Sequence, residues 1–229
     1  MDAAAHSPSS DRFEGLKLEG RPLATSEIRW FASGPPPAPV VAWFSERGRA
    51  AFVELRRDAY RIGPDYGVGL KRRDHGPLEL KRRHGISPRR EFVAGLAGGI
   101  EEWRKDGLEE PLDATGWQWS LVDKVVLTRT FAREESGSVV EIGHAGQQSS
   151  GCDIELATVT VGSTVAWTFA LEAWGEPDAR RDLLASSLSA LFDLLPPAPP
   201  QFFPALHADM GYPEWLVTTV WKEDFVASQ

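Results

Sequence analysis

The chain has 229 residues, 42% of them hydrophobic and 25% charged, and its formal net charge is −8. This composition is typical of a soluble globular protein with one large domain or two small ones. The negative net charge argues against a nucleic-acid ligand held by bulk charge. No apolar run of about 18 residues is present, so we expect no membrane-spanning helix. Cys152 is the single cysteine, which excludes an intrachain disulfide.

The N-terminus resembles neither a signal peptide nor a packed element. Met1 to His6 contain no basic region followed by an apolar core, so we expect a cytoplasmic protein without a membrane partner. Residues 1–20 are rich in Ala, Ser, Asp and Gly, which predicts a mobile tail. Residues 21–229 are expected to form a single domain.

The first predicted elements are a strand at 26–31, a short amphipathic helix at 40–44 and a strand at 52–62. Gly34 and the prolines after it end the first strand. Successive side chains of a strand point to opposite faces. The two faces of the second strand therefore carry Glu54, Arg56, Asp58 and Tyr60 on one side, and Val53, Leu55, Arg57 and Ala59 on the other.

Residues 68–83 predict a β-hairpin with one densely ionic face. The turn lies at Asp74 to Pro77, where Gly76 relaxes the backbone. One face is apolar, and the other carries charges of both signs: Lys71, Arg73, Glu79, Lys81 and Arg83. The ionic face is either a solvated outer surface with weak ion pairs or the lining of a closed barrel that meets a polyanion.

The remaining elements alternate between helices and strands. Residues 91–105 predict a helix, because Phe92, Leu96, Ile100 and Trp103 recur at helical spacing, although Gly98-Gly99 weakens the pattern. β-Branched and aromatic residues predict strands over 117–131, 139–142, 152–161 and 164–174. Residues 178–195 predict a helix with a leucine stripe, and Pro196-Pro197 end it. Strands with a polar face are best protected from exposed edges when they close into a barrel.

Several short motifs, in this order, resemble the CYTH superfamily, also called the triphosphate tunnel metalloenzymes. They are Glu27-Ile28, Arg56-Arg57-Asp58-Ala59-Tyr60, the two basic strands 69–73 and 78–83, Lys124, Asp153-Ile154-Glu155-Leu156, Leu171-Glu172 and Tyr212-Pro213-Glu214-Trp215-Leu216. The resemblance covers most of residues 25–216. It implies an α+β fold in which an eight-stranded antiparallel β-barrel, the tunnel, is flanked by helices.

The resemblance also implies a ligand and a set of site residues. The ligand is a triphosphate or another small anion that contains phosphate, because several fixed cations must meet its charges. The expected ligand-binding residues are Arg29, Arg56, Lys71, Arg73, Lys81, Arg83 and Lys124. Mg²⁺ or Mn²⁺ is expected if the protein is catalytic. The expected metal ligands are Glu27, Asp153, Glu155 and Glu172, with Glu155 and Glu172 as catalytic residues.

The first strand departs from the family pattern. The signature Glu-x-Glu-x-Lys of the family corresponds here to Glu27-Ile28-Arg29-Trp30-Phe31. Arg29 stands where the second carboxylate is expected, and Phe31 stands where the lysine is expected. A guanidinium repels a metal ion, so we expect Arg29 to occupy the metal position and to pair with Glu27, Glu155 or Glu172.

Three classes of function remain open on the sequence. The first is a metal-dependent phosphohydrolase, in which carboxylates hold the ion and basic residues stabilise the transition state. The second is a non-catalytic tunnel that binds a phosphorylated anion. The third is an interaction protein whose ionic side chains pair only with one another.

Overall fold

The computed structural model describes residues 18–47, 51–62, 66–93, 95–108, 119–143, 148–200, 202–206 and 208–220. Antiparallel pairing closes its strands into a barrel, because β8 pairs with both β2 and β10. The eight strands, in order around the barrel, are β10 (Gly151–Val161), β11 (Thr164–Trp174), β1 (Leu18–Ser33), β7 (Glu101–Leu108), β4 (Leu78–Ile86), β3 (Val68–Arg73), β2 (Phe52–Ile62) and β8 (Ser120–Arg133). The predicted eight-stranded antiparallel barrel with flanking helices is confirmed.

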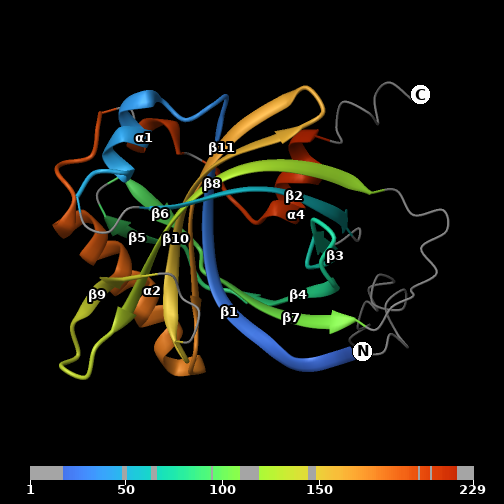
Figure 1. Ribbon diagram of the computed structural model, residues 1–229, viewed down its shortest axis with the longest axis horizontal. Coiled ribbons are helices and arrows are strands. Elements are labelled where there is room, and N and C mark those ends of the chain that lie inside the picture. Colours follow the sequence, from blue (N-terminus) through green and yellow to red (C-terminus); the bar gives the residue numbers. More distant parts are fainter. Residues whose placement is uncertain are drawn as a thin grey trace, which may run out of the picture.

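The remaining elements are shorter and lie around the barrel (Figure 1). β9 (Val139–Ile142) pairs with the end of β8, β12 (Ala208–Asp209) pairs with β1, and β5 (Arg90–Val93) pairs with β6 (Leu96–Gly98). The helices are α1 (Ala38–Phe44), α2 (Pro177–Leu194), α3 (Phe202–Ala205) and α4 (Tyr212–Trp215), which continues into a π-helical turn at Leu216–Val220. No helix in the described ranges is long and apolar enough to cross a bilayer.

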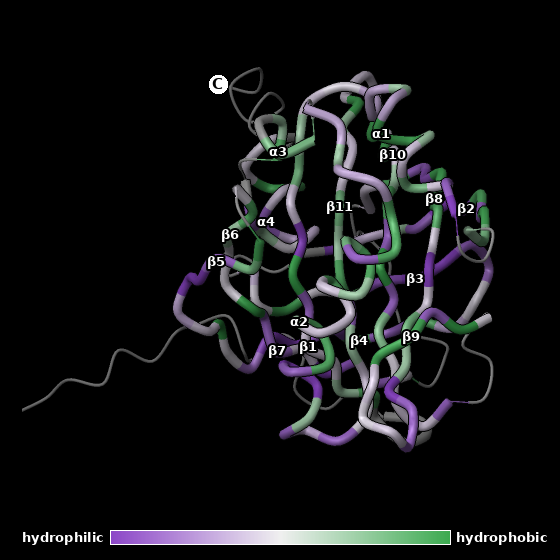
Figure 2. The backbone as a smooth tube through the Cα atoms, turned by 90° about the vertical axis from the view of Figure 1, so that its left-hand side faces the viewer, coloured by the Kyte–Doolittle hydropathy of each residue, from purple (hydrophilic) through white to green (hydrophobic). Residues whose placement is uncertain are grey.

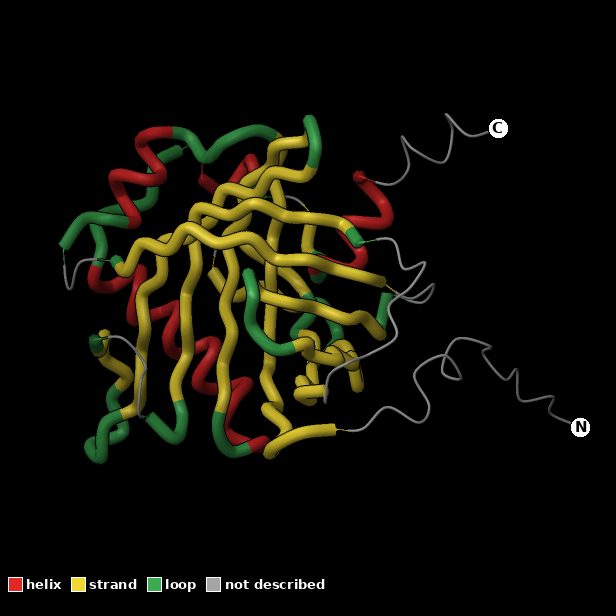
Figure 3. Tube along the Cα trace, turned by 45° about the vertical axis from the view of Figure 1, so that its right-hand side comes forward, coloured by secondary structure: helices red, strands yellow, loops and turns green. Residues whose placement is uncertain are grey.

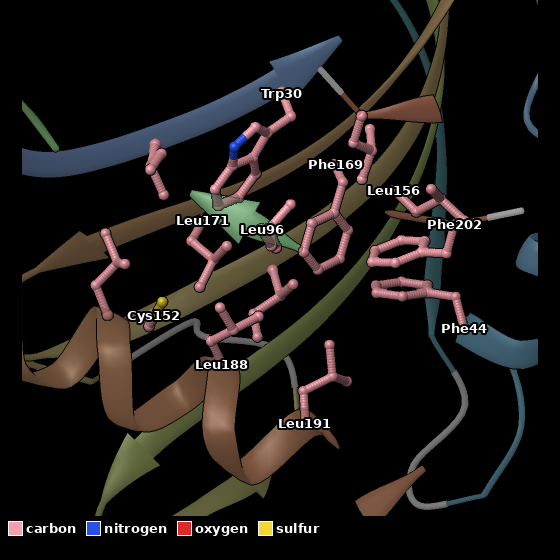
Figure 4. Close-up of a cluster of buried hydrophobic side chains, with 14 of the residues drawn as sticks. Trp30, Phe44, Leu96, Cys152, Leu156, Phe169, Leu171, Leu188, Leu191 and Phe202 are labelled. Atoms are coloured by element: carbon pink, nitrogen blue, oxygen red, sulfur yellow. The ribbon is translucent and has the colours of Figure 1, made fainter. Parts of the chain in front are cut away.

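The main hydrophobic core lies outside the barrel, between one half of its wall and the helices. β1, β10 and β11 present apolar side chains outward, and the leucines of α2 pack against them (Figure 4). Trp30, Phe169 and Phe202 lie in this core together with Leu188 and Leu191. Figures 1 and 3 show α1 and α2 on the same side of the strands. Burial of this apolar layer is therefore what attaches the helices to the barrel.

The lumen of the barrel is filled with aromatic side chains near α4. Phe31 stacks on Trp215 with ring centroids 4.9 Å apart, and Tyr60 stacks on Tyr212 at 5.7 Å. Trp215 and Leu216 are buried in the same cluster. Tyr60 and Tyr212 also line the ionic cavity, so this aromatic cluster borders it.

The helix predicted at 91–105 is wrong. β5, β6 and β7 occupy this segment, because pairing with β1 and β4 outweighs the local helical spacing of apolar residues. The two glycines belong to this arrangement. A Cβ atom at Gly98 would lie 2.8 Å from Cδ1 of Ile28, and one at Gly99 would lie 2.9 Å from the carbonyl oxygen of Ser87. The chain passes too close to its neighbours there for a larger residue.

Other boundaries differ by a few residues. Leu18–Gly20, expected in the tail, form the start of β1, and residues 1–17 lie outside the described residues. β1 continues to Ser33, and β8 runs to Arg133, two residues past the predicted end. β4 runs to Ile86, three residues past the predicted end of the hairpin. The remaining predicted strands and the helices near 40–44 and 178–195 are present within one or two residues of their expected ends.

Candidate functional site

All eight barrel strands contribute ionic side chains to one cavity in the lumen. The side chains come from alternating positions, since every second residue of a barrel strand points inward. The cavity holds about 60 Å³ of space for the centres of water molecules. Its ionic lining consists of Glu27, Arg29, Arg56, Lys71, Arg73, Lys81, Glu101, Lys105, Lys124, Glu155 and Glu172.

The charges of this lining are unequal in number. Seven side chains are basic and four are acidic. Burial lowers the pKa of Lys124 well below its usual value, although Asp58 opposes this shift. Asp58, which is buried beside the cavity, adds one more carboxylate. The lumen of this acidic protein is therefore locally positive, and local potential decides what a cavity attracts.

Glu27 and Glu172 are joined by a lysine from β7. Lys105 Nζ lies 3.3 Å from Glu27 Oε1 and also binds Glu172 Oε1, while Lys81 Nζ lies 2.7 Å from Glu27 Oε2. Burial by itself raises the pKa of Glu27, but Lys105 and Lys81 hold that pKa well below its usual value. Both oxygens of Glu27 are thus bound to ammonium groups.

Arg29 binds a carboxylate on β10, which is separated from β1 by β11. Its guanidinium donates to Glu155 Oε2 at 3.0 Å and to Thr168 Oγ1 at 2.9 Å, and its Cζ lies 4.4 Å from the ring centre of Tyr212. Arg56 Nη2 lies 3.9 Å from the second oxygen of Glu155. Burial raises the pKa of Glu155, yet Arg29 and Arg56 lower it to about 2. The expected pairing of Arg29 with a lumen carboxylate is present.

Asp58 is a single carboxylate shared among several cations. Lys124 Nζ donates to it at 2.6 Å and also to the Tyr60 hydroxyl at 2.8 Å. Lys71 Nζ and Arg56 Nε each lie 3.7 Å from Asp58 oxygens. Burial, together with Arg73 and Arg56, lowers the pKa of Lys71 to about 8 despite Asp58. One carboxylate does not neutralise this group of cations.

The structure brings most of the predicted binding residues together. Arg29, Arg56, Lys71, Arg73, Lys81 and Lys124 all line the cavity. Arg83, which was also predicted to bind the ligand, is outside the lining, and its guanidinium binds Glu101 at 2.6 Å and lies 3.7 Å from Glu214. Glu79 does not belong to the lining of the cavity.

The predicted metal ligands are divided between two places. Glu27, Glu155 and Glu172 line the cavity, whereas Asp153 is outside its lining and accepts a hydrogen bond from Thr130 at 2.7 Å. The first three carboxylates are bound to Lys81, Lys105, Arg29 or Arg56. Within the described ranges, no three His, Cys, Asp or Glu side chains gather as a group that could hold a metal ion. These donors, engaged with cations, do not fit a divalent ion such as Mg²⁺ or Mn²⁺.

Sequence reasoning missed the contribution of β7. Glu101, Trp103 and Lys105 occupy alternating positions and line the cavity. The prediction of a helix over 91–105 hid this alternation. A count of matches to a period of two over 101–105 would have revealed it. Trp103 also places its ring 4.6 Å from Lys81 Nζ, so it supports a cation of the site.

No family model, curated protein or solved structure matches this chain. The candidate site therefore rests on its own geometry.

Proposed function

We propose that the barrel binds a small phosphate-containing anion in its lumen and that it does so without a divalent metal ion. The observation that carries this proposal is the cavity lining, in which seven basic side chains meet four carboxylates, with Asp58 as a fifth carboxylate beside the cavity. A phosphorylated anion supplies the missing negative charge and several strong acceptor oxygens. The resemblance to triphosphate tunnel proteins supports the same class of ligand.

Two lumen cations have binding capacity that the protein does not use. Arg56 Nε is buried and makes no hydrogen bond within the described part of the chain. Among the described residues, the one carboxylate partner of Lys71 is the distant Asp58 at 3.7 Å, and burial lowers the pKa of Lys71 to about 8. A buried donor without an acceptor destabilises the unliganded protein. An anion that accepts hydrogen bonds from these groups removes this cost, which favours binding.

Arg29 takes the role that a metal ion has in the family pattern. Its guanidinium provides a permanent positive charge and planar donors that match phosphate oxygens. It is bound to Glu155, so an incoming anion competes with this carboxylate for the same donors. The ligand is therefore held by cations of the chain itself.

The proposal is tested by titrating the protein with tripolyphosphate in the presence of EDTA, followed by calorimetry. We expect saturable binding under these conditions and no release of orthophosphate when Mg²⁺ or Mn²⁺ is added. Binding or phosphate release that requires the metal would overturn the proposal and favour the phosphohydrolase. An absence of binding in both conditions would favour the interaction protein.

A matched pair of variants locates the binding in the lumen. A hydrogen bond to a charged group contributes about 1.5–3 kcal/mol, so Lys71→Met is expected to weaken tripolyphosphate binding by about tenfold or more. Its thermal midpoint should be unchanged or raised, because the charged form of Lys71 is disfavoured by burial. Arg57→Gln removes an exposed cation on the outer face of the barrel and should leave the affinity unchanged. Equal effects of both variants would contradict a lumen site.

A further inference from the structure

The outer face of β2 and β8 exposes an unusual number of large apolar side chains. Leu55 is 76% exposed, Val53 57%, Leu121 52% and Val125 45%. The register places Leu55 opposite Val125 and Ala59 opposite Leu121, so the side chains form one continuous surface. Contiguous apolar patches of this kind usually mark interaction sites.

This surface lies on the half of the barrel that the helices leave open. Five of the eight large hydrophobic side chains that are exposed in the described ranges belong to β2 and β8. Figure 2 shows hydrophobic stretches of these two strands on the side of the molecule away from β5 and β6. α1, α2 and α3 pack against the other half of the wall. The β2–β8 surface is thus an apolar part of the barrel wall on which no helix packs in the described ranges.

A partner cannot join this surface by adding a strand. β2 is already paired with β3 and β8, and β8 is paired with β2 and β10. Backbone groups along these strands therefore have their partners. A partner can therefore bind here only through side chains, for example by packing a second sheet face to face at a distance of about 10 Å.

The charges of the surface favour a second copy of the same chain. At its centre, Arg57 makes a two-point ion pair with Asp123, with Nε–Oδ1 at 2.6 Å and Nη2–Oδ2 at 3.0 Å. The register sets this pair between the Leu55–Val125 and Ala59–Leu121 rows. The surface carries adjacent opposite charges, so it complements itself when it is turned about a two-fold axis.

We propose that the β2–β8 surface, extended by Thr158 and Thr160 of β10, is the interface of a two-fold symmetric homodimer. Around the axis, Arg57 of each copy faces Asp123 of the other, and the apolar rows pack on one another. Asp74 and His75 also border this surface, and Arg57 is paired with Asp123, so a strongly charged partner such as a nucleic acid or an acidic peptide finds no large excess of one sign. This assembly is independent of the ligand in the lumen.

Sedimentation velocity and light scattering of the full chain over a range of concentrations test the dimer. We expect a concentration-dependent dimer for the wild type and a monomer for Leu55→Asp at the same concentrations. Leu55 is mostly exposed, so the substitution should leave thermal stability within about 0.5 kcal/mol of the wild type. Leu23→Asp places the same charge on an exposed leucine of β1 and should leave the dimer intact.

A charge exchange tests the orientation. Arg57→Asp brings like charges together and should weaken the dimer, and the double variant Arg57→Asp with Asp123→Arg should restore it. A wild type that stays monomeric throughout the range would overturn the proposal and leave the surface for another partner. A dimer that survives both Leu55→Asp and Arg57→Asp would place the interface elsewhere.

Discussion

Replacement of Glu155 by glutamine separates metal-free anion binding from metal-dependent catalysis. In the proposed function, Glu155 competes with the ligand for Arg29, which it binds at 3.0 Å, and for Arg56 at 3.9 Å. Burial raises the pKa of Glu155, but Arg29 and Arg56 lower it to about 2, so the side chain is ionised at neutral pH. Glu155→Gln therefore removes a full negative charge from the cavity while nearly conserving its volume.

The gain in affinity can be estimated from this charge. At an effective dielectric constant of about 20, two unit charges separated by about 8 Å interact by about 2 kcal/mol. We therefore expect Glu155→Gln to tighten tripolyphosphate binding by about tenfold to thirtyfold, since about 1.4 kcal/mol corresponds to tenfold. The assay is calorimetric titration in EDTA.

The same substitution should destabilise the unliganded protein. Loss of one partner of a buried ion pair costs about 3–5 kcal/mol. The Glu155 side chain is 16% exposed, and Thr168 remains an acceptor for Arg29, so we expect about 2 kcal/mol and a fall in the thermal midpoint of about 4–8 °C. Ligand should then restore more stability to the variant than to the wild type.

Glu54→Gln is the matched control. Glu54 binds Arg56 at 2.7 Å and is 30% exposed, but it does not line the cavity. Its replacement should change the affinity by less than about threefold, because its charge lies in a more solvated place. The reasoning fails if Glu155→Gln weakens binding, and a loss that appears only with Mg²⁺ or Mn²⁺ would identify Glu155 as a metal ligand.

Two further predictions concern pH and the core. Burial lowers the pKa of Lys71 to about 8, and an anion favours the protonated lysine, so the contribution of Lys71 to tripolyphosphate affinity should be full below pH 8 and should fall above it. Titrations across this range check the effect, and Lys71→Met should flatten the profile. Leu184 of α2 is completely buried, so Leu184→Ala should cost about 3 kcal/mol and lower the calorimetric midpoint by about 6–12 °C. An unchanged midpoint would show that α2 contributes little to the core.

The alternation of residue types predicted the fold correctly in most places. In the 68–83 hairpin, Lys71 and Lys81 were expected on one ionic face, and both line the lumen. The period of two is a local property of a strand, so the sequence alone shows which residues share a face. The leucine spacing of 178–195 predicted α2 for the same reason, with a period of 3.6.

The segment 91–105 shows the limit of such patterns. Its apolar residues fit a helical spacing, but pairing of β7 with both β1 and β4 decides its conformation. As a result the sequence did not predict Lys105, which links Glu27 to Glu172. Contacts between distant strands cannot be read from one segment, because the free energy of pairing depends on both partners.

The sequence by itself determined which side chains share a face in the predicted strands, most of the extended segments outside 91–105, and the concentration of charges of both signs on one face of the 68–83 hairpin. It did not determine which face of the 52–62 strand lies inward. Only closure of the barrel placed Arg56 in the lumen and Leu55 on the outside. The physical reason is that α1 and α2 bury the apolar faces of β1, β10 and β11, while the lumen pairs its charges with one another. Which faces are buried by the helices and which line the lumen depends on the whole tertiary structure. The same arrangement leaves the apolar β2–β8 surface exposed.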